Sequence, residues 1–165
     1  MNVVPGARAY IALGSNLGDS RDQLLRATAA LDAHPGVTVV ARSRYYRTPP
    51  WGIVDQPDFV NAVIEVSTSL SPSVLLDLLL DTERASGRVR DGQRWGPRVL
   101  DLDLLVYEGV TQDDERLILP HPRIRDRAFV LLPLADVAPD LHIEGQGRVV
   151  DLLESVDAGG CEVIP

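Results

Sequence analysis

Residues 99–107 alternate between apolar side chains and two carboxylates, a pattern typical of a β-strand with two different faces. Leu100, Leu102 and Leu104 share one face, which is apolar and predicts burial in a core. Asp101 and Asp103 share the other face, because residues two apart in a strand project to the same side. The stretch therefore predicts a strand that joins a core on one face and carries two adjacent carboxylates on the other.

Two readings of these carboxylates are open. Two aligned carboxylates in an apolar strand repel each other and lose hydration, and a divalent cation relieves both costs. Alternatively, the pair belongs to a solvated face and makes ion pairs with nearby arginines. The segment 94–98, Arg-Trp-Gly-Pro-Arg, runs directly into the strand. Arginines beside Mg²⁺ are what a polyphosphate requires, so this segment favours a metal–phosphate site.

The charge composition restricts the class of function. The net charge is −8, which argues against general affinity for nucleic acids. All 16 basic residues are arginine, which excludes a Walker-type phosphate loop and Schiff-base chemistry, since both need a lysine. The arginines cluster in two segments, 84–98 and 116–127. This distribution indicates that the chain binds an anion locally.

Size and composition predict one domain over residues 1–165. The apolar content of 45% and the charged content of 24% are ordinary for a soluble globular protein. No apolar run approaches the length of a membrane span, and we expect no signal peptide. The single cysteine, Cys161, precludes an intramolecular disulfide and suits a reducing cytoplasm.

The periodicity of the chain predicts alternating strands and helices. A capping box formed by Ser20 and Gln23 is expected to begin the first helix, and Ser71 with Pro72 to begin the second. We expect strands over 9–13, 37–46, 59–70, 99–107 and 117–119, helices over 20–32, 72–86, 129–138 and 149–156, and loops over 48–58 and 87–97. This order predicts an α+β fold with a ferredoxin-like core (βαββαβ).

Five ordered blocks of the chain carry a resemblance to a known family. They read AYIALGSNLGD, YYRTPPWG with DQPDFVNAV, ERASGRVR, RWGPRVLDLDLLVY and LPHPRIRDRAFVLLPLADVAPD. Together they cover roughly residues 9–142, and the chain resembles the bacterial 6-hydroxymethyl-7,8-dihydropterin pyrophosphokinases of the folate pathway.

The resemblance implies an ATP-dependent diphosphotransferase. Such an enzyme moves the β,γ-diphosphate of ATP to the hydroxymethyl oxygen of the pterin and releases AMP. The resemblance also implies two Mg²⁺ ions, a cytoplasmic location, a monomer, and a three-layer α-β-α sandwich with a mostly antiparallel sheet.

The resemblance also assigns candidate site residues by position. Asp101 and Asp103 correspond to the Mg²⁺ ligands, and Arg88 and Arg98 to the catalytic arginines. The positions that correspond to ATP contacts are Arg90, Trp95, Arg116, His121 and Arg127. The positions that correspond to the pterin pocket are Thr48, Pro49, Trp51, Phe59, Asn61 and Phe129. A pterin needs aromatic faces and an amide-type partner, which Phe59 and Asn61 can supply from one strand face.

Five positions depart from the family pattern; they are Trp51, Phe59, Leu80, Asp91 and Pro122. These departures bear on the affinity for the substrates and on the closure of the loop over ATP, and not on the reaction.

Two other classes of function remain open. One is another Mg²⁺-dependent transferase that uses a nucleotide, and the other is a non-catalytic ferredoxin-like module that binds a ligand. RNA binding is disfavoured, since the chain has only two phenylalanines and a net charge of −8.

Overall fold

The computed structural model describes residues 6–49, 57–86 and 100–165. Within these ranges the chain forms a mixed α/β fold with one main antiparallel sheet and four α-helices. The main sheet contains β1 (Ala7–Ser15), β2 (Val37–Arg42), β3 (Tyr45–Thr48), β4 (Phe59–Thr68), β5 (Asp101–Tyr107) and β10 (Glu162–Ile164). The helices are α1 (Ser20–Asp32), α2 (Pro72–Ala85), α3 (Ala128–Val137) and α4 (Val149–Ser155), with a 3₁₀ turn, η1 (Ile124–Asp126), before α3. Two short hairpins pair β6 (Gln112–Asp113) with β7 (Ile118–Leu119), and β8 (His142–Ile143) with β9 (Gly147–Arg148).

The strand register aligns four residues in one row across the sheet. The strands follow the order β10-β3-β4-β1-β5, and β2 also pairs with β4. Gly14 of β1 lies opposite Asp101 of β5 on one side and opposite Asn61 of β4 on the other. Asn61 in turn lies opposite Tyr46 of β3. Residues opposite one another project to the same face, so the row places an acidic and an amide side chain on one surface of the sheet.

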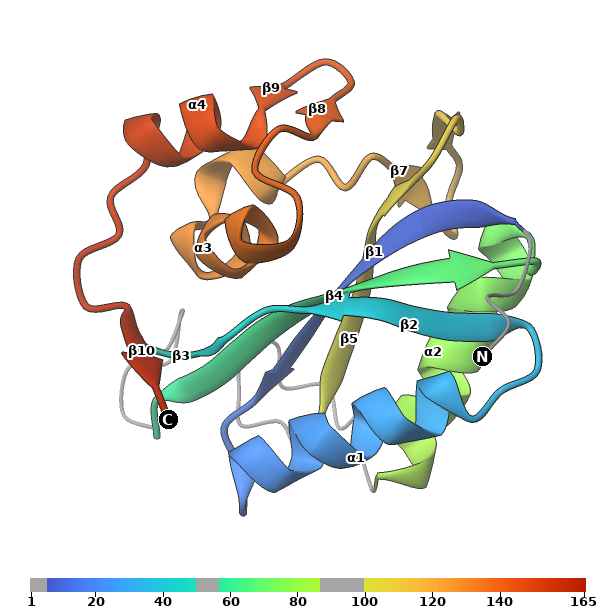
Figure 1. Ribbon diagram of the computed structural model, residues 1–165, viewed down its shortest axis with the longest axis horizontal. Helices are drawn as coiled ribbons and strands as arrows, with labels where there is room; N and C mark the ends of the chain where they lie inside the picture. Colours follow the sequence, from blue (N-terminus) through green and yellow to red (C-terminus); the bar gives the residue numbers. More distant parts are fainter. Residues whose placement is uncertain (1–5, 50–56, 87–99) are drawn as a thin grey trace.

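The helices cover both faces of the sheet. In Figure 1, α1 and α2 lie on one side of the sheet, and α3 and α4 lie on the other. The first core, between the sheet and α1 with α2, contains Ile11, Leu24, Leu31, Leu75, Leu79, Leu102 and Leu104. The second core, on the α3 side, contains Tyr10, Val63, Leu105, Val130, Leu131 and Leu134. The two sides of each central strand therefore carry different cores.

The N-termini of α1 and α2 test the two capping predictions. Ser71 caps α2: its hydroxyl accepts a hydrogen bond from the Val74 backbone N–H at 3.3 Å, and Pro72 is the first helical residue, as predicted. The capping box at Ser20 is wrong, because the N-cap is Asp19. Its carboxylate accepts the Asp22 backbone N–H at 3.3 Å. A carboxylate at this position also suits the positive end of the helix dipole.

The strand predicted over 37–46 is two strands, β2 and β3, which break at Ser43 and Arg44. The Ser43 hydroxyl accepts the Val63 backbone N–H at 2.8 Å, so a side chain replaces a backbone carbonyl in the ladder. The Arg44 backbone N–H donates instead to Asp136 of α3 at 3.1 Å. The break thus brings the residues between β2 and β3 into direct contact with α3. The short strands β6, β8, β9 and β10 were not predicted.

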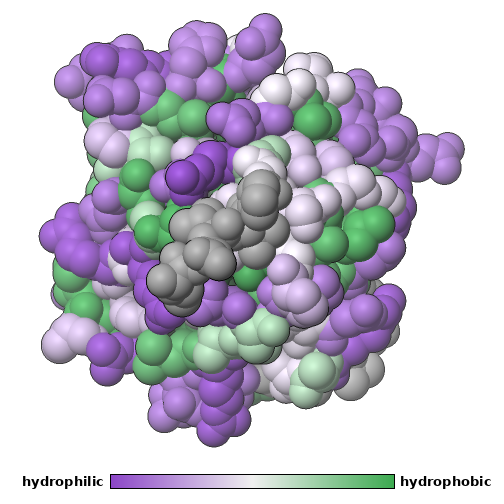
Figure 2. All heavy atoms as spheres, turned by 45° about the vertical axis from the view of Figure 1, so that its right-hand side comes forward, coloured by the Kyte–Doolittle hydropathy of each residue, from purple (hydrophilic) through white to green (hydrophobic). Residues whose placement is uncertain are grey.

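The surface mixes residue types. On the face shown in Figure 2, hydrophilic residues are widespread and hydrophobic residues form small separate groups. The exposed large hydrophobic side chains come from different elements; they are Leu17, Leu25, Val74, Ile118 and Val163. No helix in the described ranges has the length and apolar character needed to cross a membrane.

Candidate active site

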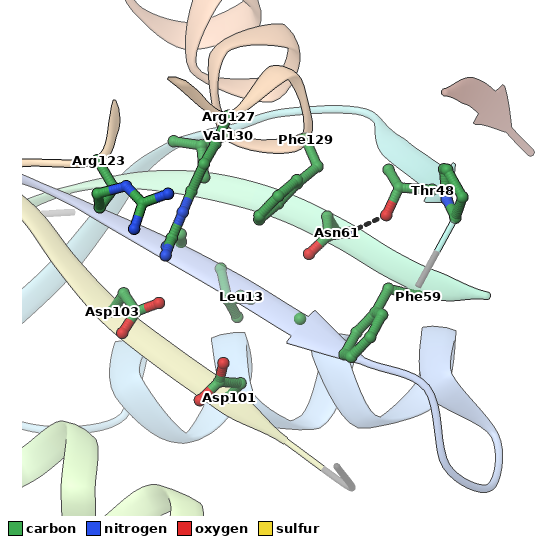
Figure 3. Close-up of a pocket in the computed structure, with 13 residues that line it drawn as sticks. Leu13, Thr48, Phe59, Asn61, Asp101, Asp103, Arg123, Arg127, Phe129 and Val130 are labelled. Atoms are coloured by element: carbon green, nitrogen blue, oxygen red, sulfur yellow. Dashed lines mark hydrogen bonds between the residues drawn. The ribbon is translucent and has the colours of Figure 1, made fainter. Parts of the chain in front are cut away.

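A cavity lies between the α3-side face of the sheet and the start of α3 (Figure 3). It is lined by Ala12, Leu13, Gly14, Thr48, Pro49, Phe59, Asn61, Asp101, Asp103, Arg123, Arg127, Phe129 and Val130. The floor comes from β1, β3, β4 and β5, and the roof comes from the segment that enters α3 and from its first turn. The cavity thus brings together residues that are distant in the chain, from Ala12 to Val130.

The carboxylates of β5 form one end of the cavity. Asp101 and Asp103 line it, whereas Leu102 and Leu104 pack into the core on the opposite face, as the alternation predicted. Glu83 of α2 is buried and accepts the Leu102 backbone N–H at 2.8 Å. This hydrogen bond anchors the β5 backbone to α2 at Leu102, the residue between Asp101 and Asp103. The positions of the two carboxylates therefore depend on a rigid part of the fold.

An amide and two aromatic rings form the other end. The Asn61 side-chain amide nitrogen donates to the Thr48 hydroxyl at 2.6 Å, and both residues are buried. This hydrogen bond fixes the orientation of the Asn61 amide. In Figure 3, Asn61 lies between Phe59 and Phe129. A fixed amide between aromatic faces suits a flat heterocycle with donors and acceptors along its edge.

Gly14 lies between the two ends and leaves space for the Asn61 amide. A Cβ atom at this position would lie 2.8 Å from Asn61 Oδ1 and 4.0 Å from Phe59 Cδ1. The first distance is shorter than any normal contact of a methyl group, so a side chain at Gly14 would displace the amide. Gly14 therefore contributes to the site because the absence of a side chain leaves room for the Asn61 amide.

Two arginines of the roof face the carboxylates. Arg123 and Arg127 point into the cavity on the side of Asp101 and Asp103 (Figure 3). The Arg127 guanidinium also lies over Phe129, with 5.7 Å between its carbon and the ring centroid. Burial lowers the pKa of Arg127 from its usual value, and the negative charge of Asp103 opposes that shift. Two guanidinium groups that face two carboxylates can bind an anion together with a cation, the arginines binding the anion and the carboxylates the cation.

His121 lies beside this roof and is neutral at pH 7. Burial lowers its pKa to about 4, and the positive charges of Arg127 and Arg123 act in the same direction. His121 Nδ1 accepts the Arg123 backbone N–H at 3.1 Å. In a neutral imidazole that accepts at Nδ1, the proton is on Nε2, which can then donate to an anion.

The donor set at the acidic end fits a hard divalent cation. Carboxylate oxygens are the protein ligands that Mg²⁺ prefers, and Mg²⁺ is usually held by one or two carboxylates with phosphate and water. Asp101 and Asp103 supply such a pair of carboxylates in the cavity. Two carboxylates in a cavity therefore suit an ion that arrives with a phosphate ligand.

Residues 10–139 match the family model of 7,8-dihydro-6-hydroxymethylpterin-pyrophosphokinase. The chain belongs to this family. It is 54% identical to a 2-amino-4-hydroxy-6-hydroxymethyldihydropteridine pyrophosphokinase of Methylorubrum extorquens, over 94% of this chain and 97% of the relative. The enzyme of the same name from Pseudomonas aeruginosa is 46% identical, over 96% of this chain and 97% of the relative.

Two longer solved chains contain the same fold. A crystal structure of HPPK-DHPS in complex with substrates has a TM-score of 0.71 and 12% sequence identity, and covers 92% of this chain. Plasmodium falciparum HPPK-DHPS with pteroate has a TM-score of 0.72 and 14% identity, and covers 90% of this chain. This chain spans 43% and 42% of those two chains, respectively. At these identities the likeness concerns the fold alone.

The structure brings many residues that the pyrophosphokinase resemblance pointed to into the one cavity; they are Thr48, Pro49, Phe59, Asn61, Asp101, Asp103, Arg127 and Phe129. Within the described part of the chain, Arg116 and His121 do not line the cavity. Arg116 makes an ion pair with Asp77 and donates to the Ser73 hydroxyl at 2.6 Å, both on α2. The remaining predicted residues, Trp51, Arg88, Arg90, Trp95 and Arg98, lie outside the described residues. Their assigned roles stay predictions.

The sequence did not single out some residues that shape this cavity. Arg123 belongs to the second arginine cluster, and that clustering is the signal that could have found it. Gly14 and Glu83 left no comparable signal, because their roles depend on neighbours in β4 and β5.

Proposed function

We propose that this protein transfers the β,γ-diphosphate of ATP to the hydroxymethyl group of 6-hydroxymethyl-7,8-dihydropterin and releases AMP, as a step of folate biosynthesis. One observation carries the proposal: a single cavity holds the Asp101 and Asp103 carboxylates at one end and the Asn61 amide with Phe59 and Phe129 at the other. The first end suits a metal-bound triphosphate, and the second suits a pterin.

The register of the sheet supports transfer between the two ends. Asp101 and Asn61 are two strands apart in the row through Gly14, and adjacent strands are about 4.8 Å apart, so their backbones are about 10 Å apart. This separation accommodates the reacting hydroxymethyl group and a phosphoryl group between a bound pterin and the carboxylates. The substrates would meet above Gly14.

The residues of the chain would contribute to the reaction mainly by positioning the substrates and by stabilising the charge of the phosphoryl groups. The substrate hydroxyl oxygen forms a bond to the β-phosphorus, the bond from that phosphorus to the α,β-bridging oxygen breaks, AMP leaves, and the hydroxyl proton passes to solvent. Arg123 and Arg127, which line the cavity, would donate hydrogen bonds to the transferred phosphoryl groups. Asp101 and Asp103 would hold Mg²⁺, which, when bound, neutralises triphosphate charge and polarises the β-phosphorus.

Several finer features belong to the same proposal. The strand order β5-β1-β4 with β2 and β3 beside β4, and helices on both sides, supports a ferredoxin-like βαββαβ core in a three-layer α-β-α sandwich. Two Mg²⁺ ions, a monomer, a cytoplasmic location and a single domain over 1–165 remain predictions. Family membership favours this enzyme over another nucleotide-dependent transferase or a non-catalytic module.

The direct test is product analysis. The protein is incubated with ATP, Mg²⁺ and 6-hydroxymethyl-7,8-dihydropterin, and nucleotides are separated by chromatography. We expect AMP in amounts equal to the pterin diphosphate formed. A matched reaction with 6-methyl-7,8-dihydropterin, which lacks the accepting hydroxyl, should give no AMP. Formation of ADP, or AMP that does not depend on the hydroxyl, would contradict the proposal.

A further inference from the structure

Asp136 on α3 joins this helix to the start of β3 through several hydrogen bonds. It accepts the Arg44 backbone N–H at 3.1 Å, the Arg44 Nε at 3.2 Å and the Arg44 guanidinium NH2 at 2.9 Å. It also accepts the Tyr46 hydroxyl at 2.8 Å, and Arg44 donates to that same hydroxyl oxygen at 3.0 Å. The three residues form a closed network between α3 and β3.

The network shares its two elements with the heterocycle end of the cavity. Asp136 follows Phe129 by seven residues in α3, which places both side chains on one face of the helix. Tyr46 and Thr48 share one face of β3, and Tyr46 lies opposite Asn61 in the register. The network therefore connects the helix that carries the aromatic roof to the strand beside the amide floor.

Apolar packing alone would hold α3 less precisely. Val130, Leu131 and Leu134 bury α3 against the sheet, but the hydrophobic effect has no preferred direction. Charge-assisted hydrogen bonds are directional, and a bidentate arginine–carboxylate pair fixes both distance and orientation. The Asp136 hydrogen bonds therefore add to the contact between α3 and the sheet a direction that apolar packing does not supply.

The ionisation of the network keeps it intact at neutral pH. Burial raises the pKa of Tyr46 to about 12, and the hydrogen bond to Asp136 acts in the same direction, so the hydroxyl remains a donor. Burial would raise the pKa of Asp136, but the hydrogen bonds from Arg44 and Tyr46 outweigh it and lower the pKa. Near neutral pH, Arg44 and Tyr46 therefore remain hydrogen-bond donors and the Asp136 carboxylate remains their acceptor.

We propose that Arg44, Tyr46 and Asp136 are positioning residues that set the gap between Phe129 and the Asn61 floor, and so set the affinity for the flat heterocyclic substrate. The inference rests on the proposed function for the identity of that substrate. The network is remote from the carboxylate end of the cavity, since Tyr46 and Asp101 end the four-strand row on opposite sides. Loss of the network should therefore weaken heterocycle binding more than ATP binding.

The test compares Tyr46→Phe and Asp136→Asn with the unaltered protein. Tyr46→Phe removes one hydroxyl and keeps the buried ring, so it is the variant least liable to unfold. Calorimetry with 6-hydroxymethyl-7,8-dihydropterin, in the presence of Mg²⁺ and a non-hydrolysable ATP analogue, gives the Kd of the heterocycle. We expect each variant to raise this Kd about tenfold, while the Kd of the analogue changes less than threefold. The double variant should be little worse than either single one, because the three residues act as one network.

A matched control is Asp140→Asn, which removes the carboxylate of an exposed ion pair with Arg148 just beyond α3. This variant should bind both ligands normally. Equal losses for the heterocycle and the ATP analogue, or lower thermal stability with an unchanged heterocycle Kd, would overturn the positioning role. If the unaltered protein fails to bind the heterocycle, the proposed function fails instead, so the two failures are distinguishable.

Discussion

Asp101 and Asn61 lie in one row of the sheet, each directly opposite Gly14 on the central strand β1. This relationship places the acidic end and the amide end of the cavity on one rigid surface. Strand pairing, unlike a loop, fixes such a distance through a continuous ladder of backbone hydrogen bonds. The site therefore depends on the sheet for its spacing, and on α3 and the segment before it for its closure.

Replacing either carboxylate should remove activity without unfolding the protein. Asp101→Asn and Asp103→Asn keep the size of the side chains but lose the charge that a divalent cation requires. We expect kcat to fall on the order of 10²- to 10³-fold or more in each variant, as measured by AMP release. Asp113→Asn, on the exposed strand β6, is the control and should be as active as the unaltered protein. Normal activity in both strand β5 variants would exclude them as metal ligands.

Arg123 should matter for ATP, and its neighbour Arg125 should not. Both residues are exposed and lie within three positions of each other, but only Arg123 lines the cavity; the Arg125 backbone N–H donates to Gln146. Hydrogen bonds to charged groups contribute about 1.5–3 kcal/mol. We therefore expect Arg123→Ala to lower kcat/KM for ATP on the order of 10- to 100-fold, and Arg125→Ala to change it less than twofold. Equal effects would show that the arginines act only through general charge.

Adding one methyl group at Gly14 should weaken pterin binding. The new Cβ in Gly14→Ala would lie 2.8 Å from Asn61 Oδ1, so the amide has to turn away from its position. We expect the Kd for the pterin to rise about tenfold by calorimetry. In an Asn61→Ala background the methyl group meets no amide, so Gly14→Ala should add little further loss. Full additivity of the two substitutions would contradict a steric role for Gly14.

His121 should give the folded protein a pH-dependent stability. Its pKa is about 4 in the folded protein and near 6.5 when unfolded. Between these values the unfolded chain binds the proton and the folded chain does not, so the free energy of unfolding falls as pH decreases from about 6.5 to 4. The slope is at most about 1.4 kcal/mol per pH unit for one proton. Urea unfolding of His121→Gln should show a smaller slope in this window, whereas exposed His142→Gln should keep it. An unchanged slope in His121→Gln would show that burial of His121 does not control this effect.

Sequence patterns predicted the regular elements because the signals that specify them are local. The alternation around Asp101 and the Ser71–Pro72 start are examples, and the structure has both. The break between β2 and β3 was missed because it depends on Asp136, which is 92 residues from Arg44. The strand β10 was missed for the same reason, since three residues near the end of the chain pair with β3. Local periodicity carries no record of such distant partners.

For the site, the sequence predicted residue types better than their surroundings. Two carboxylates two residues apart and an amide beside a phenylalanine could be read as ligands, and the structure places them in one cavity. The role of Gly14 could not be read, because a glycine at the end of a strand has many uses until the Asn61 amide is placed beside it. Arg116 was assigned to ATP by its position in the family pattern, and that role stays a prediction; the structure shows its ion pair with Asp77 on α2.

The central claim is that one cavity binds a metal-bound triphosphate at the Asp101 end and a heterocycle at the Asn61 end, so that the two ligands meet above Gly14. Mn²⁺ in place of Mg²⁺, with a non-hydrolysable ATP analogue, would relax the protons of bound 6-hydroxymethyl-7,8-dihydropterin in an NMR experiment. The relaxation should correspond to a metal-to-pterin distance below the roughly 10 Å that separates the Asp101 and Asn61 backbones, and it should disappear in a variant with Asp101→Asn and Asp103→Asn. Bound pterin that shows no Mn²⁺-dependent relaxation, or relaxation that persists in that variant, would contradict the account.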